Sequence, residues 1–139
     1  MALYMIRDRV WTGSADSANK QNVEGHGIKV AVLLDGMKLP PGADILKIEC
    51  KAWPWTPEDF RSITDFILSR IRSGLRLVIL DRTGEGNSGA LAALYLALFG
   101  YAWDEAWAAV LKINPRLSPE LPFFEAARLF ARENFAPIK

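Results

Sequence analysis

The sequence predicts an α/β fold, with a central, mostly parallel sheet flanked by helices in a single domain over residues 1–139. Two nearly continuous apolar stretches, residues 28–34 (IKVAVLL) and 75–80 (LRLVIL), are typical of strands buried on both faces. Between them, residues 56–59 (TPED) form a strong helix start: a capping Thr, Pro at the first helical position and two acids. Buried strands that alternate with helices favour a parallel sheet.

The remaining elements follow from local patterns of apolar, capping and turn residues. In chain order they are short strands near residues 3–6 and 9–11, a helix over 14–25, a strand over 45–49, and helices over 89–99, 104–113 and 120–135. We expect Ser14 or Asp16 to cap the first helix, and Gly74 to end the helix that starts after Thr56.

Composition excludes several classes of function. The 17 Lys and Arg residues nearly balance the 16 Asp and Glu residues, so no basic surface field for nucleic acid is expected. With one cysteine, Cys50, and one histidine, His26, the sequence predicts no disulfide, no metal site and no cofactor. The longest apolar run, residues 90–103, falls short of the roughly 18 residues of a membrane span. Arg7 interrupts the N-terminus, so we expect a cytoplasmic protein with no membrane partner and make no prediction of its oligomeric state.

The most informative segment is the glycine-rich turn DRTGEGNS, which joins a buried strand to an apolar helix. Its members are Asp81, Arg82, Thr83, Gly84, Glu85, Gly86, Asn87 and Ser88. Tight glycines before a helix N-terminus arrange backbone N–H groups as a concave nest, and the helix dipole adds positive potential there. In α/β folds ligands collect at the carboxyl ends of strands, so this turn is a candidate anion-binding loop.

Three stretches of the chain resemble the dual-specificity branch of the cysteine-based protein phosphatases. Residues 9–34 (RVWTGSADSANKQNVEGHGIKVAVLL) resemble its N-terminal signature, and residues 52–60 (AWPWTPEDF) stand where that family has its general-acid loop. Residues 75–115, from LRLVILDRTGEGNSG to KINP, resemble the signature loop, its helix and the helix after it. The resemblance covers nearly the whole chain and implies the phosphatase fold.

The loop matches the family pattern His-Cys-x-x-Gly-x-x-Arg-Ser-Gly at Gly84, Ser88 and Gly89 only. Leu80 stands at the histidine position and Asp81 at the position of the thiolate nucleophile.

The positions of the phosphate clamp and the general acid are also changed. Asn87 stands at the position of the arginine that grips the phosphoryl group, and Trp55 falls about where the general-acid Asp belongs. With nucleophile, clamp and acid all replaced, the resemblance implies an inactive pseudophosphatase that serves as a binding or scaffolding module. No catalytic residue is expected.

We expect the Asp81 carboxylate to occupy the nest itself, accepting hydrogen bonds from loop N–H groups and from the Ser88 hydroxyl. An ionised Asp81 would repel a phosphate by several kcal/mol, since two unit charges about 4 Å apart interact by roughly 4 kcal/mol at an effective dielectric of about 20. The favourable interaction of an anion with the helix N-terminus is worth only about 0.3 to 2 kcal/mol, which is less than this repulsion.

Two alternatives stay open. LDRTGE is similar to the Asp-Lys-Thr-Gly motif of aspartyl-phosphate enzymes, which would make Asp81 the nucleophile or base of a phosphoester hydrolase. Alternatively the domain is a structural subunit whose old site is merely filled.

Aromatic residues near the expected cleft suggest a partner surface. Trp53 and Trp55 flank a Pro in a predicted surface loop, where they would either cover the site or form an exposed binding patch. With Arg82, they are the candidate contacts for a protein partner such as a phosphorylated or acidic segment. Cys50 is expected to be an inert thiol.

Overall fold

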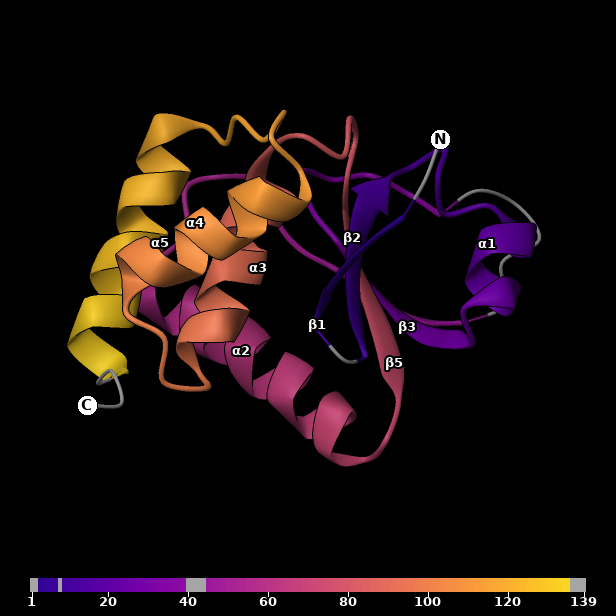
Figure 1. Ribbon diagram of the computed structural model, residues 1–139, viewed down its shortest axis with the longest axis horizontal. Helices are drawn as coiled ribbons and strands as arrows, with labels where there is room; N and C mark the ends of the chain where they lie inside the picture. The colour runs from indigo at the N-terminus through magenta and orange to yellow at the C-terminus, as the bar shows by residue number, and fades with distance from the viewer. Residues whose placement is uncertain (1–2, 8, 40–44, 136–139) are drawn as a thin grey trace.

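The computed structural model describes residues 3–7, 9–39 and 45–135 and shows one mixed sheet flanked by helices (Figure 1). The strands are β1 (Tyr4–Arg7), β2 (Val10–Ser14), β3 (Ile28–Leu33), β4 (Leu46–Glu49) and β5 (Arg76–Asp81). The helices are α1 (Lys20–Gly25), α2 (Pro57–Arg72), α3 (Asn87–Ala97), α4 (Trp103–Ile113) and α5 (Leu121–Asn134).

The sheet has the strand order β1-β2-β5-β3-β4, with β5 in the centre. β2, β5, β3 and β4 pair in parallel, and β1 joins β2 antiparallel. The predicted α/β class and mostly parallel sheet are therefore confirmed, with β1 as the antiparallel exception.

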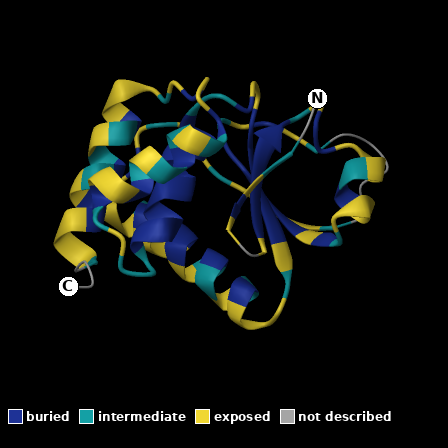
Figure 2. Cartoon of the chain, viewed as in Figure 1, coloured by how far each residue is buried: buried dark blue, intermediate teal, exposed yellow. Residues whose placement is uncertain are grey.

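The helices cover the two faces of the sheet unequally (Figure 1). α1 lies on one face above a small apolar cluster that includes Trp11, Val23 and Leu80. The other four helices lie on the opposite face around the main core. All eleven residues of α3 are buried, so this helix is the centre of that layer, as the dark blue ribbon in Figure 2 shows.

Local sequence determines where α2 begins. The Thr56 side chain accepts a hydrogen bond from the Asp59 backbone N–H at 3.3 Å, and the Asp59 carboxylate accepts one from the Thr56 N–H at 2.7 Å. This reciprocal capping box and Pro57 fix the predicted start of the helix. After α2, Gly74 adopts a φ of +83°, which confirms the predicted stop.

The predicted start of the first helix is wrong. Neither Ser14 nor Asp16 is its cap, because Ser14 ends β2 and its hydroxyl accepts a hydrogen bond from the backbone N–H of Ser17. The helix begins at Lys20, where the Asn19 side chain caps it. Between β2 and α1, the side chains of Ser14 and Ser17 each accept a hydrogen bond from the other residue's backbone N–H. These residues therefore form a local turn and not the first turn of the helix.

No helix within the described ranges is long and apolar enough to cross a membrane.

Candidate anion-binding loop

The loop of residues 81–88 lies at the carboxyl edge of the sheet, between the central strand β5 and the buried helix α3. Gly84 adopts a φ of +76°, and a Cβ at this position would lie 2.9 Å from the Ser14 backbone nitrogen. Only glycine fits such a close approach with this backbone conformation. The loop therefore packs tightly on the end of β2.

Asp81 turns its carboxylate into the centre of this loop and is 2% exposed. Oδ2 accepts hydrogen bonds from the backbone N–H groups of Gly86, at 3.0 Å, and Ser88, at 2.9 Å. Oδ1 accepts one from the Gly84 N–H, and the Thr83 hydroxyl lies 3.5 Å from it. The expected position of the carboxylate is thus correct: it accepts hydrogen bonds from backbone N–H groups of the loop.

The part of the expectation that concerns the Ser88 hydroxyl is wrong. Its Oγ is buried and makes no hydrogen bond within the part of the chain that the structure describes. Only the Ser88 backbone N–H contacts Asp81. The two carboxylate oxygens already accept hydrogen bonds from three backbone N–H groups, so the carboxylate does not need the Ser88 hydroxyl as a further donor.

Neighbouring segments hold the loop from outside. The Asn114 side chain donates to the Gly84 carbonyl at 3.3 Å, and the Ser118 N–H donates to the Glu85 carbonyl. The Asn87 side chain accepts a hydrogen bond from the Glu120 backbone N–H at 3.0 Å. Asn87 thus connects the start of α3 to the segment that precedes α5.

A second carboxylate, Asp35, stands near the loop, and the sequence did not single it out. It follows β3 with a φ of 57°. Burial raises the pKa of Asp35 most, and the charges of Asp81 and Glu120 raise it further, while a hydrogen bond from Asn87 and the charge of Arg82 lower it. The available signal was its position in the sequence, because Asp35 directly follows the apolar run 28–34 as Asp81 directly follows the apolar run 75–80.

Cys50 lies close enough to Asp35 to be affected by its charge, and its thiol is expected to be inert. Burial, followed by the negative charge of Asp35, raises its pKa to about 12. A thiol with such a pKa is essentially all protonated at neutral pH, so it is a poor nucleophile.

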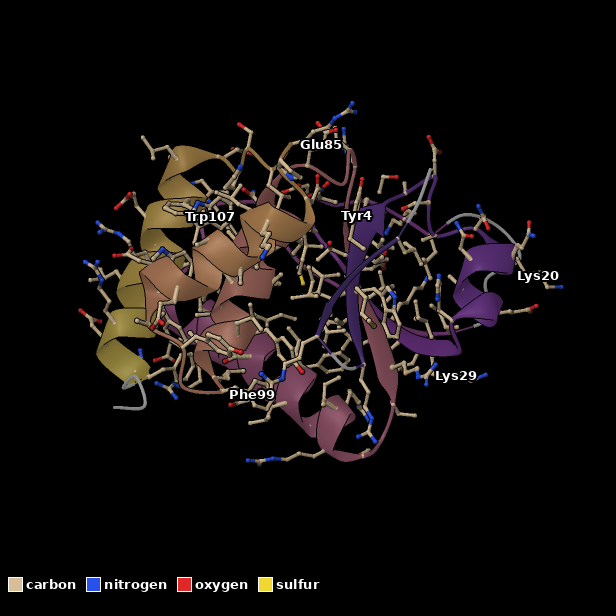
Figure 3. The ribbon with its side chains drawn as sticks, viewed as in Figure 1. Tyr4, Lys20, Lys29, Glu85, Phe99 and Trp107 are labelled. Carbon is tan, nitrogen blue, oxygen red and sulfur yellow. The ribbon has the colours of Figure 1, made fainter. Side chains whose placement is uncertain are left out.

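A polar hollow of about 180 Å³ lies beside the loop. Tyr4 of β1, Ser14, Glu85 and Arg116 are among the residues that line it, and Figure 3 shows Tyr4 and Glu85 on this side of the molecule. Arg116 is 3.9 Å from Glu85 and mostly exposed, and Arg82 is exposed as well. Arg82 of the loop and Arg116, which follows α4, therefore present their charges to solvent, while the interior of the loop holds a carboxylate.

Trp55 is buried, so the alternative in which it forms part of an exposed binding patch is wrong. It is 8% exposed and packs against Phe60 and Phe123, with ring centroids 5.1 and 5.0 Å away. Its indole N–H donates to the Lys51 carbonyl at 2.9 Å. Trp53 is half-buried and contacts Phe123 edge-on at 5.9 Å. Both rings thus pack on α5, where an aromatic cluster joins α2 to α5.

Within residues 3–7, 9–39 and 45–135, no three His, Cys, Asp or Glu side chains are grouped so that they could hold a metal ion.

Solved structures of dual-specificity phosphatases share this architecture. A putative mouse dual-specificity phosphatase, solved as a complex with zinc tungstate, matches with a TM-score of 0.83 and 16% identity, over 94% of this chain and 87% of that one. Human DUSP28 matches with a TM-score of 0.82 and 17% identity, over 96% and 95% of the two chains.

A third similar structure is the human tyrosine phosphatase-like serine/threonine/tyrosine-interacting protein. It matches with a TM-score of 0.79 and 17% identity, over 95% of this chain and 97% of that one. No protein-family model and no curated protein sequence matches this chain. The chain has the fold of the dual-specificity phosphatases, as the sequence resemblance implied.

Proposed function

We propose that this domain is a catalytically inactive member of the phosphatase fold that serves as a binding or scaffolding module. The observation that carries the proposal is the Asp81 carboxylate, which accepts hydrogen bonds from Gly84, Gly86 and Ser88 inside the loop. Those N–H groups are the donors that an incoming oxyanion would use.

Electrostatics supports the same proposal. Two unit charges about 4 Å apart repel by roughly 4 kcal/mol at an effective dielectric of about 20, and a doubly charged phosphate beside an ionised Asp81 would meet about twice that. Asp35 adds a second negative charge near the loop. The arginine that would offset such repulsion in the family is replaced by Asn87, whose side chain is uncharged.

The alternative role of Asp81, as a nucleophile or base, has less support. A nucleophile needs a lone pair directed at the phosphorus atom, but both carboxylate oxygens are held by backbone donors. Moving the carboxylate oxygens out of the nest would leave these backbone N–H groups without a partner, which costs about 1–3 kcal/mol for each buried group.

The partner we propose is a protein segment that contacts the outside of the loop. An acidic or phosphorylated side chain would pair with the exposed Arg82 and Arg116 rather than enter the nest. Trp55 does not belong to this surface because its ring is buried.

The experiment measures turnover of an aryl phosphate together with thermal stability in increasing tungstate at fixed ionic strength. For the native chain we expect no turnover of the aryl phosphate and no saturable change of Tm with tungstate. Asp81→Ala should free the nest and gain a saturable rise in Tm, of several degrees once tungstate is far above its Kd. Glu85→Gln, which removes a loop charge outside the nest, is the matched control and should respond like the native chain. Turnover by the native chain that disappears in Asp81→Ala would overturn the proposal.

A further inference from the structure

The outer face of α5 is formed by the exposed residues Leu121, Glu125, Leu129 and Arg132. Figure 2 shows exposed, yellow surface on the side of this helix that faces away from the rest of the fold. These residues recur every three or four positions, which places them along one side of the helix. The core-facing side carries Phe123, Ala127 and Phe130. The outer face therefore has no partner element among the described residues.

This outer face is more apolar than a solvated helix surface needs to be. Leu121 is 69% exposed and Leu129 is 57% exposed, and they lie two turns apart. Leu129 and Ala126 border two hollows: one of about 280 Å³ is lined by α5 alone, and one of about 160 Å³ lies between α5 and the start of α2. An exposed leucine that borders hollows is a surface of the kind that helices use to pack on each other.

The charges on the outer face differ between the two halves of the helix. Glu125 lies in the N-terminal half, whereas Arg128 and Arg132 lie in the C-terminal half and outnumber the one exposed acid there, Glu133. Glu125 and Arg128 already lie 2.6 Å apart within the chain. If the α5 helix of a second copy packed antiparallel on this face, Glu125 of each copy would lie against the arginines of the other. Because a twofold axis relates the two copies, this contact would form twice.

We infer that the outer face of α5 is a homodimer interface, in which two copies of this chain pack their α5 helices antiparallel about a twofold axis. Leu121 and Leu129 supply the apolar contact, and Glu125 pairs with Arg128 or Arg132 of the second copy. This face is independent of the loop at Asp81, so the two proposals stand or fall separately.

Sedimentation of the native chain over a range of concentrations is the first part of the test. The apparent mass should rise reversibly toward twice the 15.5 kDa of one chain. Leu129→Lys should hold the mass at that of the monomer. Leu46→Lys, which changes an exposed leucine on β4, is the matched control and should dimerise like the native chain.

A charge-reversal mixture is the second part. Glu125→Arg gives the outer face an excess of basic side chains, with Glu133 as the remaining exposed acid, and the double variant Arg128→Glu with Arg132→Glu makes the face acidic. Each alone should stay monomeric because like charges meet in its homodimer, and an equimolar mixture should regain the doubled mass.

Because each variant lacks the native pair within its own helix, recovery in the mixture reports contacts between chains. A native chain that stays monomeric at every soluble concentration would overturn the inference. So would variants that dimerise alone as well as the native chain does.

Discussion

The Oδ2 atom of Asp81 lies 2.9 Å from the backbone nitrogen of Ser88, so the end of β5 is bonded directly to the first turn of α3. Gly86 donates to the same oxygen and Gly84 to the other. One carboxylate therefore accepts hydrogen bonds from three backbone donors, and the loop closes around a side chain of its own. The order of the loop should consequently depend on Asp81.

Replacing the carboxylate by an amide should destabilise the domain. Asp81→Asn keeps the size of the side chain but turns an NH₂ group toward backbone donors in the nest. We expect the free energy of unfolding to fall by about 1–3 kcal/mol, measured by denaturant titration. Asp16→Asn, on an exposed turn, is the control and should change it by less than about 0.5 kcal/mol. Equal stability of the two variants would contradict the role given to Asp81.

The close contact at Gly84 should tolerate no side chain. Gly84→Ala would place a Cβ 2.9 Å from the Ser14 nitrogen at a positive φ, so we expect a loss of about 1–3 kcal/mol in unfolding free energy. Gly25→Ala is the matched control because a Cβ at Gly25 would meet no atom within 4 Å and its φ is not positive. A loss of the same size at both glycines would show that the contact with β2 is not responsible.

Stability should depend on pH through Asp35. Its pKa is raised in the folded state, first by burial and then by Asp81 and Glu120. Ionised Asp35 therefore lowers stability: the penalty is absent below the unfolded pKa, grows as the pH rises through the window up to the folded pKa, and is complete above it.

Asp35→Asn should accordingly raise Tm at neutral pH and lose that advantage at acidic pH. Asn tolerates the positive φ of this position, so the backbone is retained. The gain should stay below about 1 kcal/mol, because the half-buried charge is partly screened by solvent. A gain that persists below the unfolded pKa would mean that charge is not its cause.

The buried position of Trp55 predicts a large effect on stability. Trp55→Ala removes a ring that contacts Phe60 and Phe123, so the unfolding free energy should fall by about 3–5 kcal/mol. Trp53→Ala should cost less because Trp53 is only half-buried. Chemical denaturation followed by circular dichroism compares the two, and the reverse order of losses would contradict this packing.

Much of the fold was predictable because its signals are local. The apolar runs that became β3 and β5 and the TPED start of α2 each carry their own pattern. The position of Asp81 was predictable for a similar reason: glycines between a strand and a helix leave backbone donors that a nearby carboxylate can satisfy.

The remaining features depend on contacts between distant segments. Asp35 reaches the site only because β3 lies next to β5 in the sheet, an adjacency that the chain order alone does not specify. Trp55 is buried because Phe123, far along the chain, packs against it. The polar segment before α1 satisfied helix rules, but its serines form a local turn instead.

The central claim, that Asp81 fills the anion nest, is tested most directly by following the backbone amides of Gly84, Gly86 and Ser88 by NMR during a tungstate titration. In the native chain these three resonances should stay in place, and in Asp81→Ala they should shift together and saturate. Saturable shifts of the same three amides in the native chain would show that an oxyanion displaces the carboxylate, and would contradict the account.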